Sequence, residues 1–133
     1  TQSGYEVFID GARLATGKDA LEWIKQGEKL GAGEICINSI DRDGTLSGFD
    51  IELMKLAEKK VNVPLIASGG AGKAEHLKTL FSETQAQAAI ISSMLYSPRL
   101  ERNFTVRELK DYLAENNVRV RPQCTVSSKE RGV

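Results

Sequence analysis

Short apolar segments alternate with amphipathic ones along this 133-residue chain, and this alternation limits its fold more than any other feature. Apolar, β-branched segments predict strands that begin at residues 34, 64 and 88, so consecutive strands start 30 and 24 residues apart. Regular β/α alternation is typical of parallel strands joined by helical crossovers. A closed (β/α)8 barrel needs eight such pairs and roughly 200 residues or more. Three pairs, preceded by a helix without its strand, therefore predict an α/β fold that is the C-terminal half of a (β/α)8 barrel.

Turn and capping signals divide the chain into individual elements. Alternating apolar residues around Asp10-Gly11 predict a β-hairpin with a tight turn. Asp50 is placed to cap one helix, and Thr105 with Glu108 forms a capping box for another. The expected strands are 34–40, 64–70 and 88–95, and the expected helices are 18–31, 50–60, 73–83 and 105–117.

The half-barrel is expected to occupy residues 1–121. Residues 122–133 show no periodicity, and we expect them to form a disordered tail. In the first helix, Leu21, Ile24 and Leu30 are expected on one apolar face.

Composition excludes several classes of function. Eighteen basic residues balance eighteen acidic ones, so no net field attracts nucleic acid or an anionic membrane, and we expect neither partner. The chain has no signal peptide or membrane-length apolar segment, so the cytoplasm is its expected location. The single histidine, His76, excludes Cys/His-rich zinc sites and argues against a Ser-His or Cys-His catalytic pair. Cys36 lies in an apolar segment and is expected to be a buried thiol.

The acidic loop Ser39–Asp50, SIDRDGTLSGFD, fits two kinds of site. Asp41, Asp43 and Asp50 take its third, fifth and twelfth positions, nearly the spacing of a helix-loop-helix calcium loop. A calcium loop follows a helix, however, whereas the segment before Ser39 is a predicted strand. A solvated acidic turn remains an alternative, because most charged loops have no other role. We expect no metal here and interpret the loop as one that holds the carboxylate of Asp43 over a pocket.

Two loops of small residues follow the next two predicted strands. One contains Gly69, Gly70 and Gly72 before a helix start, and the other contains Ser92 and Ser93. Glycines let a backbone approach an anion closely, and free N–H groups at a helix N-terminus point at it. Phosphates in β/α barrels commonly bind at the loops after strands seven and eight. Either loop alone is as compatible with a structural turn, but the pair beside an acidic loop predicts an anion site.

Period-two alternation orients the strand 34–40. Ile35 and Ile37 are expected to face the helices, which places Glu34 and Asn38 on the opposite, lumenal side. Asn38 would then line the mouth of the barrel. Glu34 would enter the lumen at the other end, where a carboxylate needs a partner, unless it leans into solvent before the strand begins.

Three blocks, GAGEICINSIDRDGTLSGFD, PLIASGGAGKAEH and TVRELKDYL, closely resemble the C-terminal half of the cyclase subunits of imidazole glycerol phosphate synthase. The resemblance runs from about residue 5 to residue 121. It implies a (β/α)8 barrel of the ribulose-phosphate-binding type that needs no cofactor. Such a cyclase takes ammonia from a glutaminase partner and converts phosphoribulosyl-formimino-aminoimidazole carboxamide ribotide to imidazole glycerol phosphate and aminoimidazole carboxamide ribotide.

The resemblance also implies roles for particular residues. Asp43 would be catalytic, Glu34 would belong to a charged ammonia gate, and Asn38 and Ser68 would contact the phosphorylated substrate. One of the two phosphate cradles of the family would be formed by Gly70, Ala71, Ser92 and Ser93.

The chain departs from the family in what it lacks. The two principal acid–base aspartates of the family lie on its first and fifth strands, neither of which this chain contains. The second phosphate cradle belongs to the N-terminal half-barrel, a further expected partner. This chain alone is therefore expected to be nearly inactive. Two alternative functions remain open. The chain could belong to a paralogue that supplies ammonia to another pathway, such as surface-polysaccharide sugar synthesis, or be a non-catalytic half-barrel that self-associates through its strand edges.

Overall fold

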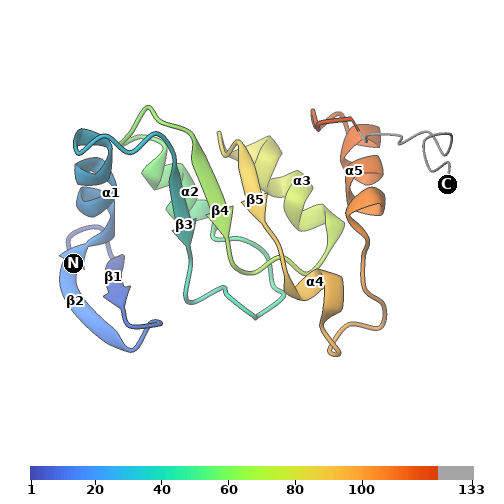
Figure 1. The fold of residues 1–133 in the computed structure, drawn as a ribbon, viewed down its shortest axis with the longest axis horizontal. Coiled ribbons are helices and arrows are strands. Elements are labelled where there is room, and N and C mark those ends of the chain that lie inside the picture. Colours follow the sequence, from blue (N-terminus) through green and yellow to red (C-terminus); the bar gives the residue numbers. More distant parts are fainter. Residues whose placement is uncertain (123–133) are drawn as a thin grey trace, which may run out of the picture.

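Two small sheets and the helices around them make up the computed structural model, which describes residues 1–122 (Figure 1). The antiparallel sheet consists of β1 (Glu6–Ile9) and β2 (Leu14–Asp19), and the parallel sheet has the order β3 (Ile35–Asn38), β4 (Leu65–Ser68), β5 (Ala88–Ile90). The helices are α1 (Ala20–Lys29), α2 (Ile51–Ala57), α3 (Ala74–Glu83), α4 (Ser93–Tyr96) and α5 (Val106–Glu115). Apart from Pro122, the predicted tail lies outside the described residues.

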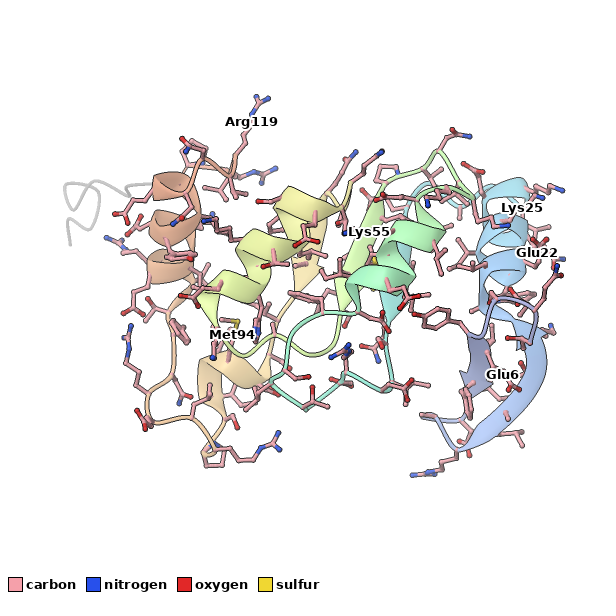
Figure 2. All side chains as sticks on the ribbon, turned by 180° about the vertical axis from the view of Figure 1, so that it is seen from behind. Glu6, Glu22, Lys25, Lys55, Met94 and Arg119 are labelled. Carbon is pink, nitrogen blue, oxygen red and sulfur yellow. The ribbon has the colours of Figure 1, made fainter. Side chains whose placement is uncertain are left out.

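The parallel sheet carries helices on one face. Figures 1 and 2, which view the molecule from opposite sides, both place α2 and α3 against this face, with α1 at one flank and α5 at the other. Within residues 1–122, β3 and β5 each pair with β4 alone, so both have an unpaired edge. An open parallel sheet with β/α alternation confirms the predicted half-barrel arrangement. No helix in the described part of the chain has the length and apolarity needed to cross a membrane.

The hydrophobic core lies between the parallel sheet and its helices. Leu21 and Ile24 of α1 are buried there, and Ile35 and Ile37 of β3 pack against them and their neighbours, as predicted. The prediction for Leu30 is wrong: it is the C-cap residue of α1 and is 77% exposed. The helix ends before Leu30 can turn towards the core.

The predicted strand 88–95 is wrong in its second half. β5 ends at Ile90, and the chain then turns into α4, whose backbone N–H groups bond to the carbonyls of Ser92 and Ser93. This turn carries Met94, labelled in Figure 2, into the core, where its side chain is fully buried. Burial of Met94 therefore favours a helical turn over a longer strand.

The predicted hairpin is present, but its turn is wider than expected. Four residues, Asp10–Arg13, connect β1 to β2, and three of them, Asp10, Gly11 and Ala12, have positive φ angles. Consecutive left-handed residues lengthen the turn beyond the two-residue form that the Asp-Gly pair predicts.

Both predicted helix caps are confirmed. The Asp50 carboxylate accepts a hydrogen bond of 3.0 Å from the backbone N–H of Leu53. Thr105 and Glu108 form the reciprocal capping box of α5. A hydrogen bond from Arg102 and the bonds of the box lower the pKa of Glu108 to about 2.

The prediction that Cys36 is buried is wrong. Cys36 alternates with Ile35 and Ile37 and lies on the sheet face that has no helices, where it is exposed. Partial desolvation raises the pKa of its thiol. Burial of Cys36 would require a second layer over this face of the sheet, which residues 1–122 do not provide.

Candidate active site

The parallel register brings the carboxyl ends of the three strands together. Asn38 of β3 lies beside Ser68 of β4, which lies beside Ile90 of β5, so the loops that follow leave the same edge of the sheet (Figure 1). These loops share one cleft, lined by Asp43, Gly44, Leu46, Ser68, Gly69, Gly70, Ala71, Ile90, Ile91, Ser92 and Ser93. The cleft thus includes every residue predicted to act in catalysis or phosphate binding, together with Ser68.

The cleft is small and carries no lysine or arginine among its described lining residues. Its volume is about 30 Å³, which is the space of about one water molecule. An oxygen of an anion could enter it, while the rest of the anion stays at the mouth. Backbone N–H groups and the hydroxyls of Ser68, Ser92 and Ser93 are donors among its lining residues, and Asp43 is an exposed residue of the same lining.

Two glycines set how closely the first two loops approach. The backbone N–H of Gly48 donates to the carbonyl of Gly70 at 2.8 Å. Gly70 has a φ of +105°, and a Cβ atom there would overlap the carbonyl of Gly48. The loops therefore meet backbone to backbone, which only glycine permits at Gly70. The glycines expected to admit an anion thus also have a packing role.

The acidic loop is held from several sides. The backbone N–H of Asp43 donates to the carbonyl of Ser39 at 2.9 Å, and the guanidinium of Arg99 donates to the carbonyl of Gly44. Arg99 comes from the turn after α4, so it joins the first and third loops across the cleft. This contact was not foreseen, because the two residues are far apart in the sequence.

Asp50 ties the acidic loop to the rest of the fold. Besides capping α2, its carboxylate accepts the buried hydroxyl of Ser39 at 3.1 Å and the phenol of Tyr5 at 3.4 Å. Desolvation and the negative charge of Asp50 raise the pKa of Tyr5. These hydrogen bonds give the Asp50 carboxylate a structural role. A strand, β3, precedes the loop where a calcium loop would follow a helix, and both observations argue against the calcium-loop interpretation.

His76 is a residue near the site that the sequence interpretation missed. Its Nδ1 accepts a hydrogen bond of 3.1 Å from the backbone N–H of Gly72. Desolvation and then the charge of Lys73 lower its pKa, which Glu75 partly offsets. The available signal was its place in the first turn of α3, where a side chain can reach back to the residues before the helix.

Asn38 and Glu34 do not line the cleft. Asn38 is exposed at the end of β3 and adjoins Gly69, where an added Cβ would stand 3.3 Å from its Oδ1. Glu34 is exposed directly before β3, at the amino ends of the strands, and pairs with no cation within residues 1–122. The structure therefore separates Glu34 from the other predicted site residues by the length of a strand.

Comparison with known proteins finds both a matching family model and similar relatives. A family model described as "Histidine biosynthesis protein" matches residues 1–101. The chain is 48% identical over 121 residues to imidazole glycerol phosphate synthase subunit HisF of Desulfatibacillum aliphaticivorans, covering 91% of this chain and 45% of that protein. It is 50% identical over 117 residues to the subunit HisF of a Hydrogenobaculum species, covering 88% and 45%. This chain thus spans somewhat less than half the length of the curated relatives it matches.

Proposed function

Because this chain belongs to the histidine biosynthesis protein family, we propose that it provides the C-terminal half of the cyclase barrel of imidazole glycerol phosphate synthase. The complete barrel would use ammonia from a glutaminase subunit to convert phosphoribulosyl-formimino-aminoimidazole carboxamide ribotide to imidazole glycerol phosphate and aminoimidazole carboxamide ribotide. In this proposal the enzyme works in the cytoplasm.

One observation carries the proposal: an exposed carboxylate and two loops of small residues share a cleft at the carboxyl ends of parallel strands. Active sites of β/α barrels lie at this end, and phosphate groups bind to the loops after the last two strands. The backbone at Gly70 and Ala71, with Ser92 and Ser93, would hold one of the two phosphates of the substrate.

Asp43 would transfer protons during ring closure, and Asn38 and Ser68 would orient the substrate beside it. General acid–base catalysis contributes roughly 10²–10⁴-fold to a rate. The remainder would come from holding the substrate at both phosphates, which places the reacting groups in position. This chain offers one phosphate cradle, so we expect little turnover without the other half-barrel.

Glu34 would be part of the ammonia entrance at the amino ends of the strands. Its position at the opposite end from the phosphate loops supports this role. A carboxylate that enters the lumen there would need cationic partners, and the other half-barrel would have to supply them.

The anion site can be tested without disturbing the glycine packing. Replacing both Ser92 and Ser93 by alanine removes two donors but keeps the backbone, whereas Gly70→Val would clash with Gly48 and test folding instead. In the complete barrel the double variant should raise KM for the cyclase substrate by roughly tenfold, as expected for two lost hydrogen bonds. Ser82→Ala, on the exposed surface of α3, is the matched control and should leave KM unchanged. An equal KM for all three proteins would mean that the cradle is elsewhere.

The exposed edges of the sheet favour a second candidate, a half-barrel that acts only by assembling with another. β3 and β5 each have an unpaired edge within the described residues, and an apolar groove between α3, β5 and α5 includes Phe81, Leu109 and Val118. Sedimentation of the purified chain, with and without an N-terminal half-barrel, separates the candidates. Stable self-association that the added half does not displace would favour pure assembly.

A further inference from the structure

We propose that His76 is a positioning residue whose neutral imidazole holds the glycine loop before α3 in its anion-binding conformation. The inference rests on the proposed anion site at Gly70 and Ala71. It gives a role to the one histidine of the chain, which no catalytic or binding assignment uses.

The start of α3 explains why this loop needs such a contact. Lys73 is the N-cap residue, but its side chain makes no capping hydrogen bond. His76 stands three residues later, and its Nδ1 accepts the N–H of Gly72 at 3.1 Å. In a capping box a side chain at this helical position accepts the N–H of the cap residue itself. His76 instead reaches one residue further, into the glycine loop.

The imidazole also adjoins the acidic loop. A methyl group added to Gly48 would stand 3.5 Å from Cδ2 of His76, so the ring occupies the space directly beside the Cβ position of this glycine. Gly48 is the residue whose N–H binds the carbonyl of Gly70. His76 therefore lies beside both loops of the junction: it binds Gly72 in one loop and is next to the position that a side chain at Gly48 would occupy in the other. Ala71, whose backbone is part of the proposed cradle, lies between Gly70 and Gly72.

Only a neutral imidazole can make this contact. A protonated Nδ1 would face the N–H of Gly72 as a second donor, and the positive end of α3 also disfavours a cation there. Desolvation and Lys73 lower the pKa of His76, while Glu75 opposes them. His76 lines a second cleft, distinct from the anion cleft. The other titratable groups that line it are Tyr5 before β1, Asp41, Arg42 and Asp50 of the acidic loop, and Glu52 of α2. Protonation at low pH should therefore release the loop and weaken anion binding.

Sulfate is a suitable probe, because its charge does not change between about pH 8 and about pH 5.5. Its dissociation constant can be measured on the complete barrel by calorimetry at both pH values. His76→Phe keeps a ring but removes the acceptor, and it should weaken sulfate binding by about three- to tenfold at the higher pH, the effect of one lost hydrogen bond. His76→Asn keeps an acceptor near the position of Nδ1 and cannot be protonated in this range. It should bind sulfate within about twofold of the unaltered barrel and lose less affinity at the lower pH.

Nitrogen NMR of the ring gives a readout that does not depend on activity or on sulfate. The expected form at neutral pH is the tautomer with its proton on Nε2, and the expected pKa lies below 6.5. A proton on Nδ1, or sulfate binding that His76→Phe leaves unchanged, would overturn the role of His76 alone. Failure of the unaltered barrel to bind sulfate would overturn the anion site and this inference with it. If the inference is right, His76→Phe should also raise the KM of the cyclase reaction more than it lowers kcat.

Discussion

The carboxyl and amino ends of the parallel strands are held together by different kinds of contact. At the carboxyl ends, the acidic loop and the glycine loop meet directly through the backbone hydrogen bond from Gly48 to Gly70, and side chains of Arg99 and His76 add further bonds to these loops. At the amino ends, glutamate side chains bind neighbouring turns. Glu28 of α1 accepts the N–H groups of Asn62 and Val63, and Glu58 accepts the N–H of Gln85.

The two ends of the strands therefore differ in their tasks: the carboxyl ends fix the geometry of the proposed site, and the amino ends support the fold. The backbone hydrogen bond at the carboxyl ends fixes the distance between two loops that carry proposed donors and a carboxylate. Side-chain contacts at the amino ends can change length and rotamer without moving a proposed ligand. In β/α barrels catalysis lies at the first end and the other end serves stability. Substitutions at the two ends should therefore fail in different assays.

The largest effect is expected from Gly70→Ala at the junction of the loops. A Cβ there overlaps the carbonyl of Gly48 at a φ of +105°, so the free energy of unfolding should fall by about 3 kcal/mol or more. Gly44→Ala is the matched control, because Gly44 also has a positive φ, +72°, but open space around it. In Gly44→Ala the free energy of unfolding should fall by only about 1 kcal/mol. Urea unfolding of the complete barrel measures both, and equal losses would contradict the packing role of Gly70.

Asp43→Asn should affect turnover and leave stability alone. The side chain of Asp43 is exposed, and the amide of asparagine keeps its shape but cannot accept a proton as a base. In the complete enzyme kcat should fall by about tenfold or more, which corresponds to about 1.4 kcal/mol of transition-state stabilisation. An unchanged kcat with a raised KM would make Asp43 a residue that only binds substrate.

Glu28→Ala should show the opposite pattern at the amino ends. The variant leaves the N–H groups of Asn62 and Val63 without their acceptor, which should cost about 1–2 kcal/mol in the free energy of unfolding. Steady-state kinetics should give an unchanged KM, because Glu28 is remote from the cleft. A raised KM with normal stability would show that the two ends are not separate.

Glu34→Gln tests the one function proposed for the amino ends, and its effect should be the smallest. In the proposed enzyme, ammonia from the medium would enter the open end of the barrel, whereas ammonia from a glutaminase would have to pass Glu34. Glutamine-dependent turnover of the complete enzyme should therefore fall a few-fold more than ammonia-dependent turnover. Equal losses in both assays would make Glu34 a structural residue.

Local signals were sufficient to predict the order of elements and their caps. The caps at Asp50 and Thr105 depend on residues within one helical turn, so the sequence displays them directly. Alternation along β3 also predicted which side Ile35 and Ile37 face. Convergence of the loops followed from the parallel strands alone, since all carboxyl ends meet at one edge.

Several errors depend on distant parts of the molecule, whereas those at Leu30 and in the hairpin turn are local. Burial of Cys36 required a layer that residues 1–122 do not contain, and the end of β5 was set by the burial of Met94. The contact of Gly70 with Gly48 joins loops more than twenty residues apart, so this packing role of Gly70 could not be predicted from the sequence. The role of His76 was not predicted, because its hydrogen bond with Gly72 depends on where α3 begins and on its N-cap Lys73 making no capping bond.

A phosphate titration of the complete barrel, followed by backbone amide NMR, tests the central claim most directly. If these residues form one phosphate cradle, the amide signals of Gly70, Ala71, Ser92 and Ser93 should shift together, with one dissociation constant. A separate cleft beside Trp23 of α1 is lined by Lys18, Lys25 and Lys29. Shifts confined to these lysines, with none at the carboxyl ends of β4 and β5, would contradict the proposed phosphate site.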